Sequence, residues 1–215
     1  MTSIYQQIIS KGKIETLDQL NEYFDKVISN EWVNTYFIDS RNLIGDITIQ
    51  RFFNYTFIYD YTGNPVNKGI DACSIPDSRV VGVFGISNIE INKSNRSMMK
   101  KFLGKPGAYD CLGGKYDRGH FIAHLSGGPI DINLFPQRRD INRGWSIEGK
   151  KYREMERFIA ANPGIFVFSR PLYGDFSCCP YEIEFGYCNK ELIFTVENFP
   201  NKYSRAISSK KRKLI

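Results

Sequence analysis

The sequence predicts an α+β fold with a central, mainly antiparallel β-sheet, and three observations support this class. Apolar residues recur at helical spacing near the N-terminus, whereas aromatic and β-branched residues dominate two later stretches, residues 32–91 and 164–197. No internal repeat or low-complexity linker divides the 215 residues. A chain of this length can bury one well-packed core, so we expect a single domain over residues 1–215.

The first segment, residues 1–31, reads as helical, with helices expected at 3–10 and 17–30. The second helix has an apolar stripe made of Leu17, Leu20, Phe24, Val27 and Ile28. Thr16 followed three residues later by Gln19 matches a capping box, which marks the start of this helix. We expect the stripe to pack on the core.

Residues 32–114 are expected to supply strands that complete the sheet. The candidate strands are 33–38, 47–59, 79–86 and 88–91. Residues 101–114 form a glycine-rich loop that leads into the central segment, 115–161. After that segment, residues 162–200 contain three more candidate strands, 164–171, 181–187 and 191–197, before a basic tail at 201–215.

Charge is distributed unevenly along the chain. Residues 1–100 hold 10 Lys and Arg against 11 Asp and Glu, whereas residues 101–215 hold 19 against 12. A basic half fits a polyanionic partner such as nucleic acid, because neutralising phosphates releases counterions. An ordinary solvated surface with a basic tail, where Lys210–Lys213 gives four cations in a row, is an equally good explanation of charge alone.

The five cysteines form no CxxC pair, and their odd number is a poor disulfide framework. We therefore expect reduced thiols and a cytoplasmic protein. The N-terminus lacks the apolar core of a signal peptide, and no run approaches the roughly 20 apolar residues of a membrane span. No membrane partner is expected, and export would require a partner machine.

The chemistry-bearing residues gather in the central segment. Both histidines of the chain lie there, His120 and His124. The segment also contains the amides Asn133, Gln137 and Asn142 and the arginines Arg118, Arg138, Arg139 and Arg143. A general base, metal-ligating amides and phosphate-binding cations are the groups that phosphodiester hydrolysis needs.

His120 is the candidate base because an imidazole with a pKa of about 6.5 is mostly neutral at cellular pH. Gly119 lets the backbone approach closely beside it, and Arg118 offers a fork of donors for phosphate oxygens. An isolated histidine is more often structural than catalytic. A zinc pair of His120 and His124 on one helix is a weaker alternative, since Gly119 and Gly127-Gly128 disfavour a helix there.

The run Asp117-Arg118-Gly119-His120 resembles the DRGH signature of the DNA/RNA non-specific endonucleases, which belong to the ββα-metal (His-Me finger) group that includes endonuclease G and bacterial polymorphic-toxin nuclease domains. Asn133-Leu-Phe-Pro-Gln137 with Ile141-Asn142-Arg143-Gly144 is similar to the second block of the family. Residues 152–156 (YREME) resemble its carboxylate-bearing helix. The resemblance covers roughly residues 115–172 and implies a strand–loop–strand–helix finger.

The resemblance implies a role for each matching residue. His120 matches the general base, Asn142 the one direct protein ligand to Mg²⁺, for which Mn²⁺ can substitute, and Arg118 the phosphate contact. Asn133 and Gln137 match amides that order the metal waters, and Asp117 matches the motif acid, for which we expect a structural role. Arg138, Arg139 and Arg143 are the candidate nucleic-acid contacts. His124 has no clear counterpart and is expected to be a hydrogen-bonded core histidine or a groove residue.

The carboxylate departs from the family pattern. Glu156 lies 14 residues after Asn142, about 21 Å along a continuous helix at 1.5 Å per residue, which is too far to serve the same metal. We expect residues 144–149 (GWSIEG) to form an inserted loop, with the helix beginning near Lys150. Glu156 would then share a face with Tyr152 and Ile159, and Glu148 is the alternative acid.

These observations predict a Mg²⁺-dependent endonuclease that cleaves DNA, and RNA as well, with little sequence preference and 5′-phosphate products. Two rivals remain: a non-catalytic nucleic-acid-binding module with the same finger, and a site-specific nicking enzyme. A cytosolic nuclease must spare its own genome, so we expect restraint by an inhibitor (immunity) protein, export, or activation in a defence system. The similarity of the second block to toxin domains favours a bacterial effector.

Overall fold

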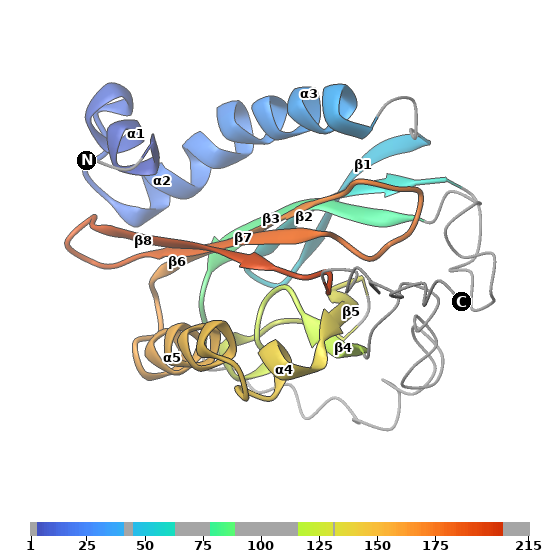
Figure 1. The fold of residues 1–215 in the computed structure, drawn as a ribbon. Coiled ribbons are helices and arrows are strands. Elements are labelled where there is room, and N and C mark those ends of the chain that lie inside the picture. The colour runs from blue at the N-terminus through green and yellow to red at the C-terminus, as the bar shows by residue number, and fades with distance from the viewer. Residues whose placement is uncertain (1–3, 41–44, 63–77, 89–115, 131, 204–215) are drawn as a thin grey trace, which may run out of the picture.

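The computed structural model of the protein describes residues 4–40, 45–62, 78–88, 116–130 and 132–203. Within them the chain forms an α+β structure built on a six-stranded antiparallel sheet with strand order β1-β2-β3-β6-β7-β8. N-terminal helices cover one face of the sheet, and a two-stranded hairpin with two helices covers the other (Figure 1). None of the described helices is both long and apolar enough to cross a membrane.

The N-terminal helices follow the predicted stripe but continue beyond it. The elements are α1 (Ile4–Gly12), α2 (Leu17–Tyr23), η1 (Phe24–Ile28) and α3 (Ser29–Ser40). The predicted capping box is present, with Gln19 N–H donating to Thr16 Oγ1 at 3.2 Å and Thr16 N–H donating to Gln19 Oε1 at 3.3 Å. The helix therefore begins at Leu17, as predicted.

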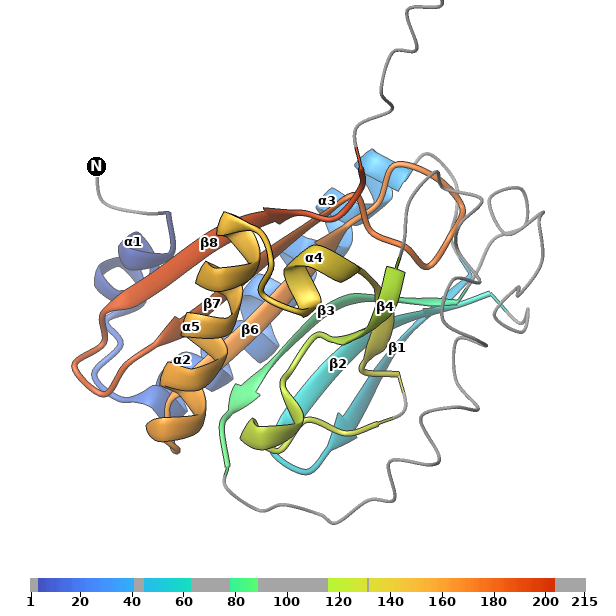
Figure 2. The same cartoon turned by 60° about the horizontal axis from the view of Figure 1, so that its bottom comes forward.

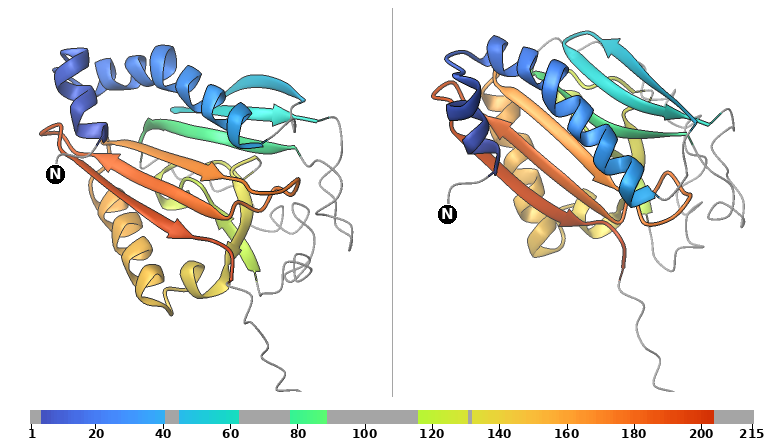
Figure 3. Two further views of the ribbon diagram at one scale, coloured as in Figure 1. Left: turned by 45° about the horizontal axis from the view of Figure 1, so that its top comes forward. Right: turned by 90° about the horizontal axis from the view of Figure 1, so that it is seen from above.

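The predicted strand at 33–38 is wrong, because these residues form α3. Buried side chains recur every fourth residue, at Leu20, Phe24, Ile28, Trp32 and Tyr36. A four-residue step slightly exceeds one α-helical turn, and the wider π-helical turn η1, where Ser29 N–H donates to Phe24 O, offsets the resulting drift. The stripe therefore stays in the core as far as Tyr36, and Figure 3 shows α3 crossing the sheet diagonally.

The predicted strand at 47–59 is instead a hairpin of β1 (Asp46–Phe52) and β2 (Tyr55–Tyr61). The turn has no glycine or proline, and Phe53 takes the left-handed conformation with φ of 53°. The strand predicted at 79–86 is confirmed as β3 (Arg79–Ile86). Asn88 belongs to no strand, and the rest of the predicted strand at 88–91 lies outside the described residues, as do residues 101–114 and most of the basic tail.

The three C-terminal strands are confirmed with small shifts at their ends. They are β6 (Phe166–Leu172), β7 (Glu182–Cys188) and β8 (Phe194–Pro200). β6 pairs with β3, so the sheet joins strands that lie about 80 residues apart in the sequence. Both halves of the chain therefore build one sheet.

Both faces of the sheet are buried, which explains the nearly continuous apolar runs of β3 and β6. Phe166 and Phe168 point to the N-terminal helices, where they surround Phe24 with ring centroids 4.6 and 5.8 Å away. Val167 points to the opposite core, which also contains Tyr152 and Met155 of helix α5 (Ile147–Ala161). The second core attaches the central segment to the sheet.

Candidate functional site

The central segment forms a hairpin followed by two helices, on the sheet face opposite α3 (Figure 2). Strands β4 (Tyr116–His120) and β5 (Leu134–Arg138) pair antiparallel, with His120 opposite Leu134 and Tyr116 opposite Arg138. Helix α4 (Arg139–Asn142) follows β5 directly, and α5 comes next. The Phe121 and Phe135 rings stack at 4.3 Å and fix the hairpin to the core.

Gly119 pairs with Phe135 across this hairpin, and the side chain of Gln137, two residues further along β5, packs against it. A Cβ atom on Gly119 would lie 2.4 Å from Gln137 Oε1 and 2.5 Å from Gln137 Cβ, closer than real contacts allow. Gln137 is only 1% exposed, so the atoms packed around its side chain prevent it from moving away from an added methyl group. The hairpin therefore requires glycine before His120 for packing. The sequence predicted a close approach at Gly119 but not that the neighbour would be the Gln137 side chain.

Asn133 holds the loop that connects β4 to β5. Its fully buried side chain accepts from Ile122 N–H at 2.9 Å and donates to the carbonyl oxygens of Ile122 and Pro129, both at 2.8 Å. These three bonds to the backbone occupy the amide, so the structure shows Asn133 as a loop clamp.

His120 and His124 do not share a helix, so the alternative of a helical zinc pair is wrong. His120 ends β4, whereas His124 begins the 3-10 turn η4 (His124–Ser126), where its Nδ1 lies 3.4 Å from Gly128 O. In the described ranges no group of three or more His, Cys, Asp or Glu side chains is arranged to hold a metal ion. A metal ligated mainly by such residues therefore does not fit this part of the chain.

His120 is held through its backbone. The Tyr152 hydroxyl of α5 donates to His120 O at 3.1 Å, and the Tyr152 ring is 2% exposed against Phe185 and Phe199. The residue is half-buried, and its Nε2 atom is shielded from solvent. Helix α5 thereby fixes the backbone position from which the His120 side chain extends.

Asp117, the first residue of the motif, pairs with two arginines that follow β5. Arg143 Nε donates to one carboxylate oxygen at 2.6 Å, and Arg139 Nε donates to the other at 3.0 Å. Burial raises the pKa of Asp117, but the hydrogen bonds from Arg143 and Arg139 outweigh this effect and hold the pKa below its usual value. This arrangement fits the structural role expected for Asp117.

The three arginines predicted to contact nucleic acid have different environments. Arg138 binds both carboxylate oxygens of Asp140, donates to Pro200 O at 3.1 Å and lies over the Tyr203 ring, with 15% of its side chain exposed. Arg139 is 24% exposed, whereas Arg143 is 48% exposed. Arg138 therefore links the hairpin to the C-terminal strand end, and Arg143 is the one most open to a ligand.

The connection between the helices differs in part from the expected inserted loop. Helix α5 begins at Ile147, and Ser146 caps it by accepting from Gly149 N–H at 3.0 Å. Gly149 lies inside the helix, where a Cβ would meet Asp140 O at 2.4 Å, so it permits the close contact between α4 and α5. The break between the two helices is shorter than predicted and turns at Gly144, with φ of 69°.

Glu156 lies on the face of α5 on which it was predicted. It is half-buried on the face of α5 that contains Tyr152 and Ile159, whereas Glu148 is exposed. Burial raises the pKa of Glu156 to about 7, although Arg153 and Arg157 act in the opposite direction. Near neutral pH this group can therefore donate or accept a proton.

Asn142 ends α4 with a half-buried side chain that makes no hydrogen bond to any residue in the described ranges. An amide oxygen without a protein partner suits a hard ion that keeps most of its waters, as Mg²⁺ does. The residues present therefore fit a metal held by one protein oxygen, and Asn142 is the side chain that would hold it.

Arg118 lies half-buried on β4, two residues before His120.

Comparison with known proteins gives no further guide to the site. No family model matches the chain, and no curated protein sequence matches it either.

Several contributors to this region were not predicted from the sequence. The exposed Lys150, Arg153 and Arg157 make no ion pair within the described part of the chain. They recur at i, i+3 and i+7, a spacing that places them on one face of α5 and could have revealed them. Asn201, which is fully buried and binds Arg138 N–H and Pro136 O, both at 2.8 Å, gave no local signal.

Proposed function

We propose that this protein is a metal-dependent endonuclease that hydrolyses DNA, and RNA as well, with little sequence preference, through a ββα-metal finger formed by β4, β5 and the helices that follow. One observation carries the proposal. His120 ends the first strand of a hairpin, and Asn142 ends the helix that directly follows the second strand, with an amide that makes no hydrogen bond to the described residues. A base and a metal-ligating amide oxygen on one hairpin–helix unit suit phosphodiester hydrolysis.

In this proposal Asn142 holds Mg²⁺, or Mn²⁺ in its place, through the amide oxygen. The ion would supply positive charge against the phosphate oxygens during hydrolysis. Asn142 as the single protein ligand would leave room for water and phosphate oxygens around the ion.

Neutral His120 would remove a proton from the attacking water. Its backbone anchor to Tyr152 limits where the imidazole can reach, and the water would attack phosphorus in line with the leaving oxygen. Arg118 would contact a phosphate oxygen, and Glu156, with its pKa near neutrality, would hold a water by donating or accepting. Because the 3′-oxygen leaves, the products carry 5′-phosphates.

The test is incubation of the purified protein with plasmid DNA and Mg²⁺, with and without a chelator. We expect a smear of fragments that disappears with chelator, and end-labelling that shows 5′-phosphates. Products with 3′-phosphates would contradict the mechanism. Binding without cleavage would support the non-catalytic module, and a defined band pattern would support the site-specific nicking enzyme.

An active nuclease inside a cell needs restraint, so we propose an inhibitor or immunity protein, or a defence-system partner, as the second component. Expression of the wild type alone should be toxic, whereas expression of an inactive variant should be tolerated. Harmless high-level expression of active enzyme would remove the need for such a partner.

A further inference from the structure

The two tryptophans of the chain have opposite environments. Trp32 is 3% exposed in the core beneath α3, whereas Trp145, between α4 and α5, is 63% exposed. Tryptophan is usually well buried, because a solvated indole forfeits a large hydrophobic gain. An exposed indole three residues after Asn142 therefore needs an explanation.

The backbone of Trp145 is fixed. Asp140 O accepts the N–H groups of Trp145 at 2.8 Å and of Ser146 at 3.4 Å. Gly144 supplies the left-handed turn just before, and a Cβ there would lie 2.7 Å from Arg153 Cδ. The indole is thus presented outward from a rigid turn, and Arg153 packs beside that turn.

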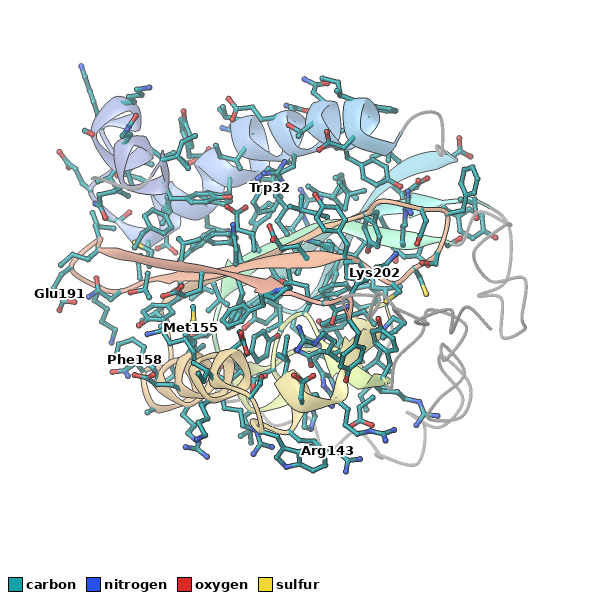
Figure 4. All side chains as sticks on the ribbon, in the orientation of Figure 1. Trp32, Arg143, Met155, Phe158, Glu191 and Lys202 are labelled. Carbon is teal, nitrogen blue, oxygen red and sulfur yellow. The ribbon has the colours of Figure 1, made fainter. Side chains whose placement is uncertain are left out.

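A chain of contacts connects this indole to the DRGH strand. The Arg143 guanidinium lies 5.0 Å from the centroid of the Trp145 ring and at the same time donates to Asp117 at 2.6 Å. Figure 4 shows Arg143 on the outer side of α4 and α5, away from the sheet. Asp117 therefore holds the cation that braces the ring.

We propose that Trp145 and Arg143 form a stacking platform for an unpaired nucleobase, so that the site prefers single-stranded nucleic acid. This inference rests on the proposed function for its substrate class. Exposed aromatic rings next to cations bind single strands because every base has a face that can stack. Bases inside a duplex already stack on each other and cannot reach the ring without being extruded.

Charge around the platform fits the same ligand. Lys150, Arg153 and Arg157 are exposed on α5 without an ion pair in the described part of the chain, and they can follow a phosphate backbone. The indole would then hold a base while these cations hold the phosphates on either side. The platform determines which form of nucleic acid is bound, and it takes no part in the proton transfers.

The test measures binding with the full chain carrying His120→Ala, so that no substrate is consumed. The Tyr152 bond reaches the backbone of residue 120, so alanine there retains it. Fluorescence anisotropy would follow a labelled 12-nucleotide single strand, its duplex, and a single strand of abasic residues. Each would be titrated against His120→Ala alone and with Trp145→Phe, Trp145→Ala or, as a control, Ile147→Ala. Ile147 is a suitable control because it is 85% exposed and only two residues from Trp145.

We expect Trp145→Ala to weaken binding of the single strand about tenfold, with Trp145→Phe retaining most of the affinity. Binding of the duplex and of the abasic strand should change less than about twofold, and Ile147→Ala should change nothing. The single strand should also quench indole fluorescence in the parent and not in Trp145→Phe, where only the buried Trp32 remains.

The inference is overturned if Trp145→Ala binds the single strand as the parent does, or weakens all three ligands equally. It is also overturned if no ligand binds. These outcomes are distinct from failure of the proposed function, which is measured by cleavage with the wild type. If the wild type cleaves nucleic acid but Trp145→Ala binds the single strand normally, only the stacking platform is contradicted. If Trp145→Ala weakens binding but the wild type does not cleave, only the nuclease function is contradicted.

Discussion

The Tyr152 hydroxyl donates to the backbone carbonyl oxygen of His120 at 3.1 Å, across 32 residues of sequence. This bond joins the end of β4 to the middle of α5 in a region where Tyr152 is almost wholly buried. Its acceptor is a main-chain atom, so the bond positions the backbone of residue 120 and does not involve the imidazole.

We predict that Tyr152→Phe lowers the free energy of unfolding by about 1–2 kcal/mol, because a buried carbonyl group loses its hydrogen bond. The cleavage rate should also fall, since residue 120 is then less firmly placed. Urea unfolding and plasmid digestion would measure the two effects. Tyr187→Phe is the matched control, because the Tyr187 hydroxyl makes no hydrogen bond within the described residues, and it should change neither quantity.

Gly119→Ala should destabilise the fold by about 2–3 kcal/mol, because the new methyl group would overlap the buried Gln137 side chain. Gly174→Ala is the control, since the nearest atom to a Cβ there is 3.4 Å away and the position is exposed. Thermal unfolding of both variants would test this prediction. Equal melting temperatures for the two would show that the hairpin does not need glycine beside His120.

Glu156→Gln should remove a pH dependence of stability. Because the pKa of Glu156 is raised from 4.5 to about 7, the folded protein binds more protons than the unfolded chain between these values. Stability of the wild type should therefore fall as pH rises from about 4.5 to about 7, and level off above, by on the order of 2 kcal/mol.

Urea unfolding of the wild type and Glu156→Gln at several pH values isolates this effect, because other groups titrate equally in both. The difference in free energy between the two proteins should grow through that window in favour of the variant. A difference that stays constant with pH would mean that Glu156 has an ordinary pKa.

Asn142→Ala should leave thermal stability within about 0.5 kcal/mol of the wild type, because its side chain makes no hydrogen bond in the described part of the chain. Cleavage should require a much higher Mg²⁺ concentration or be lost. A Mg²⁺ titration of the initial rate measures this, with Asn30→Ala, an exposed amide on α3, as the control. An unchanged Mg²⁺ requirement would show that the metal is held elsewhere.

Local patterns predicted the elements whose hydrogen bonds and packing follow directly from sequence spacing. The capping box at Thr16 and the apolar run of β3 are two such cases. The helix at 33–38 was predicted as a strand because its β-branched and aromatic residues fit a strand equally well. Only the four-residue spacing from Leu20 to Tyr36 distinguishes the helix. The β1–β2 turn was missed because Phe53 adopts a conformation that usually requires glycine.

The sequence predicted which residues form the candidate site, but it did not predict the hydrogen-bond and ion-pair partners of those residues. Arg138 looks like a surface cation in sequence, yet Pro200 and Tyr203, more than 60 residues later, hold it in place. Likewise, Asp117 engages Arg139 and Arg143 only because the hairpin folds back on itself. Such long-range pairs depend on topology, which local spacing does not encode.

Replacement of His120 by alanine tests the central claim most directly. With fold and nucleic-acid binding verified, the initial rate of plasmid cleavage in Mg²⁺ should fall by about 10²–10⁴-fold, the usual contribution of a general base. Cleavage by His120→Ala at the wild-type rate would contradict the account.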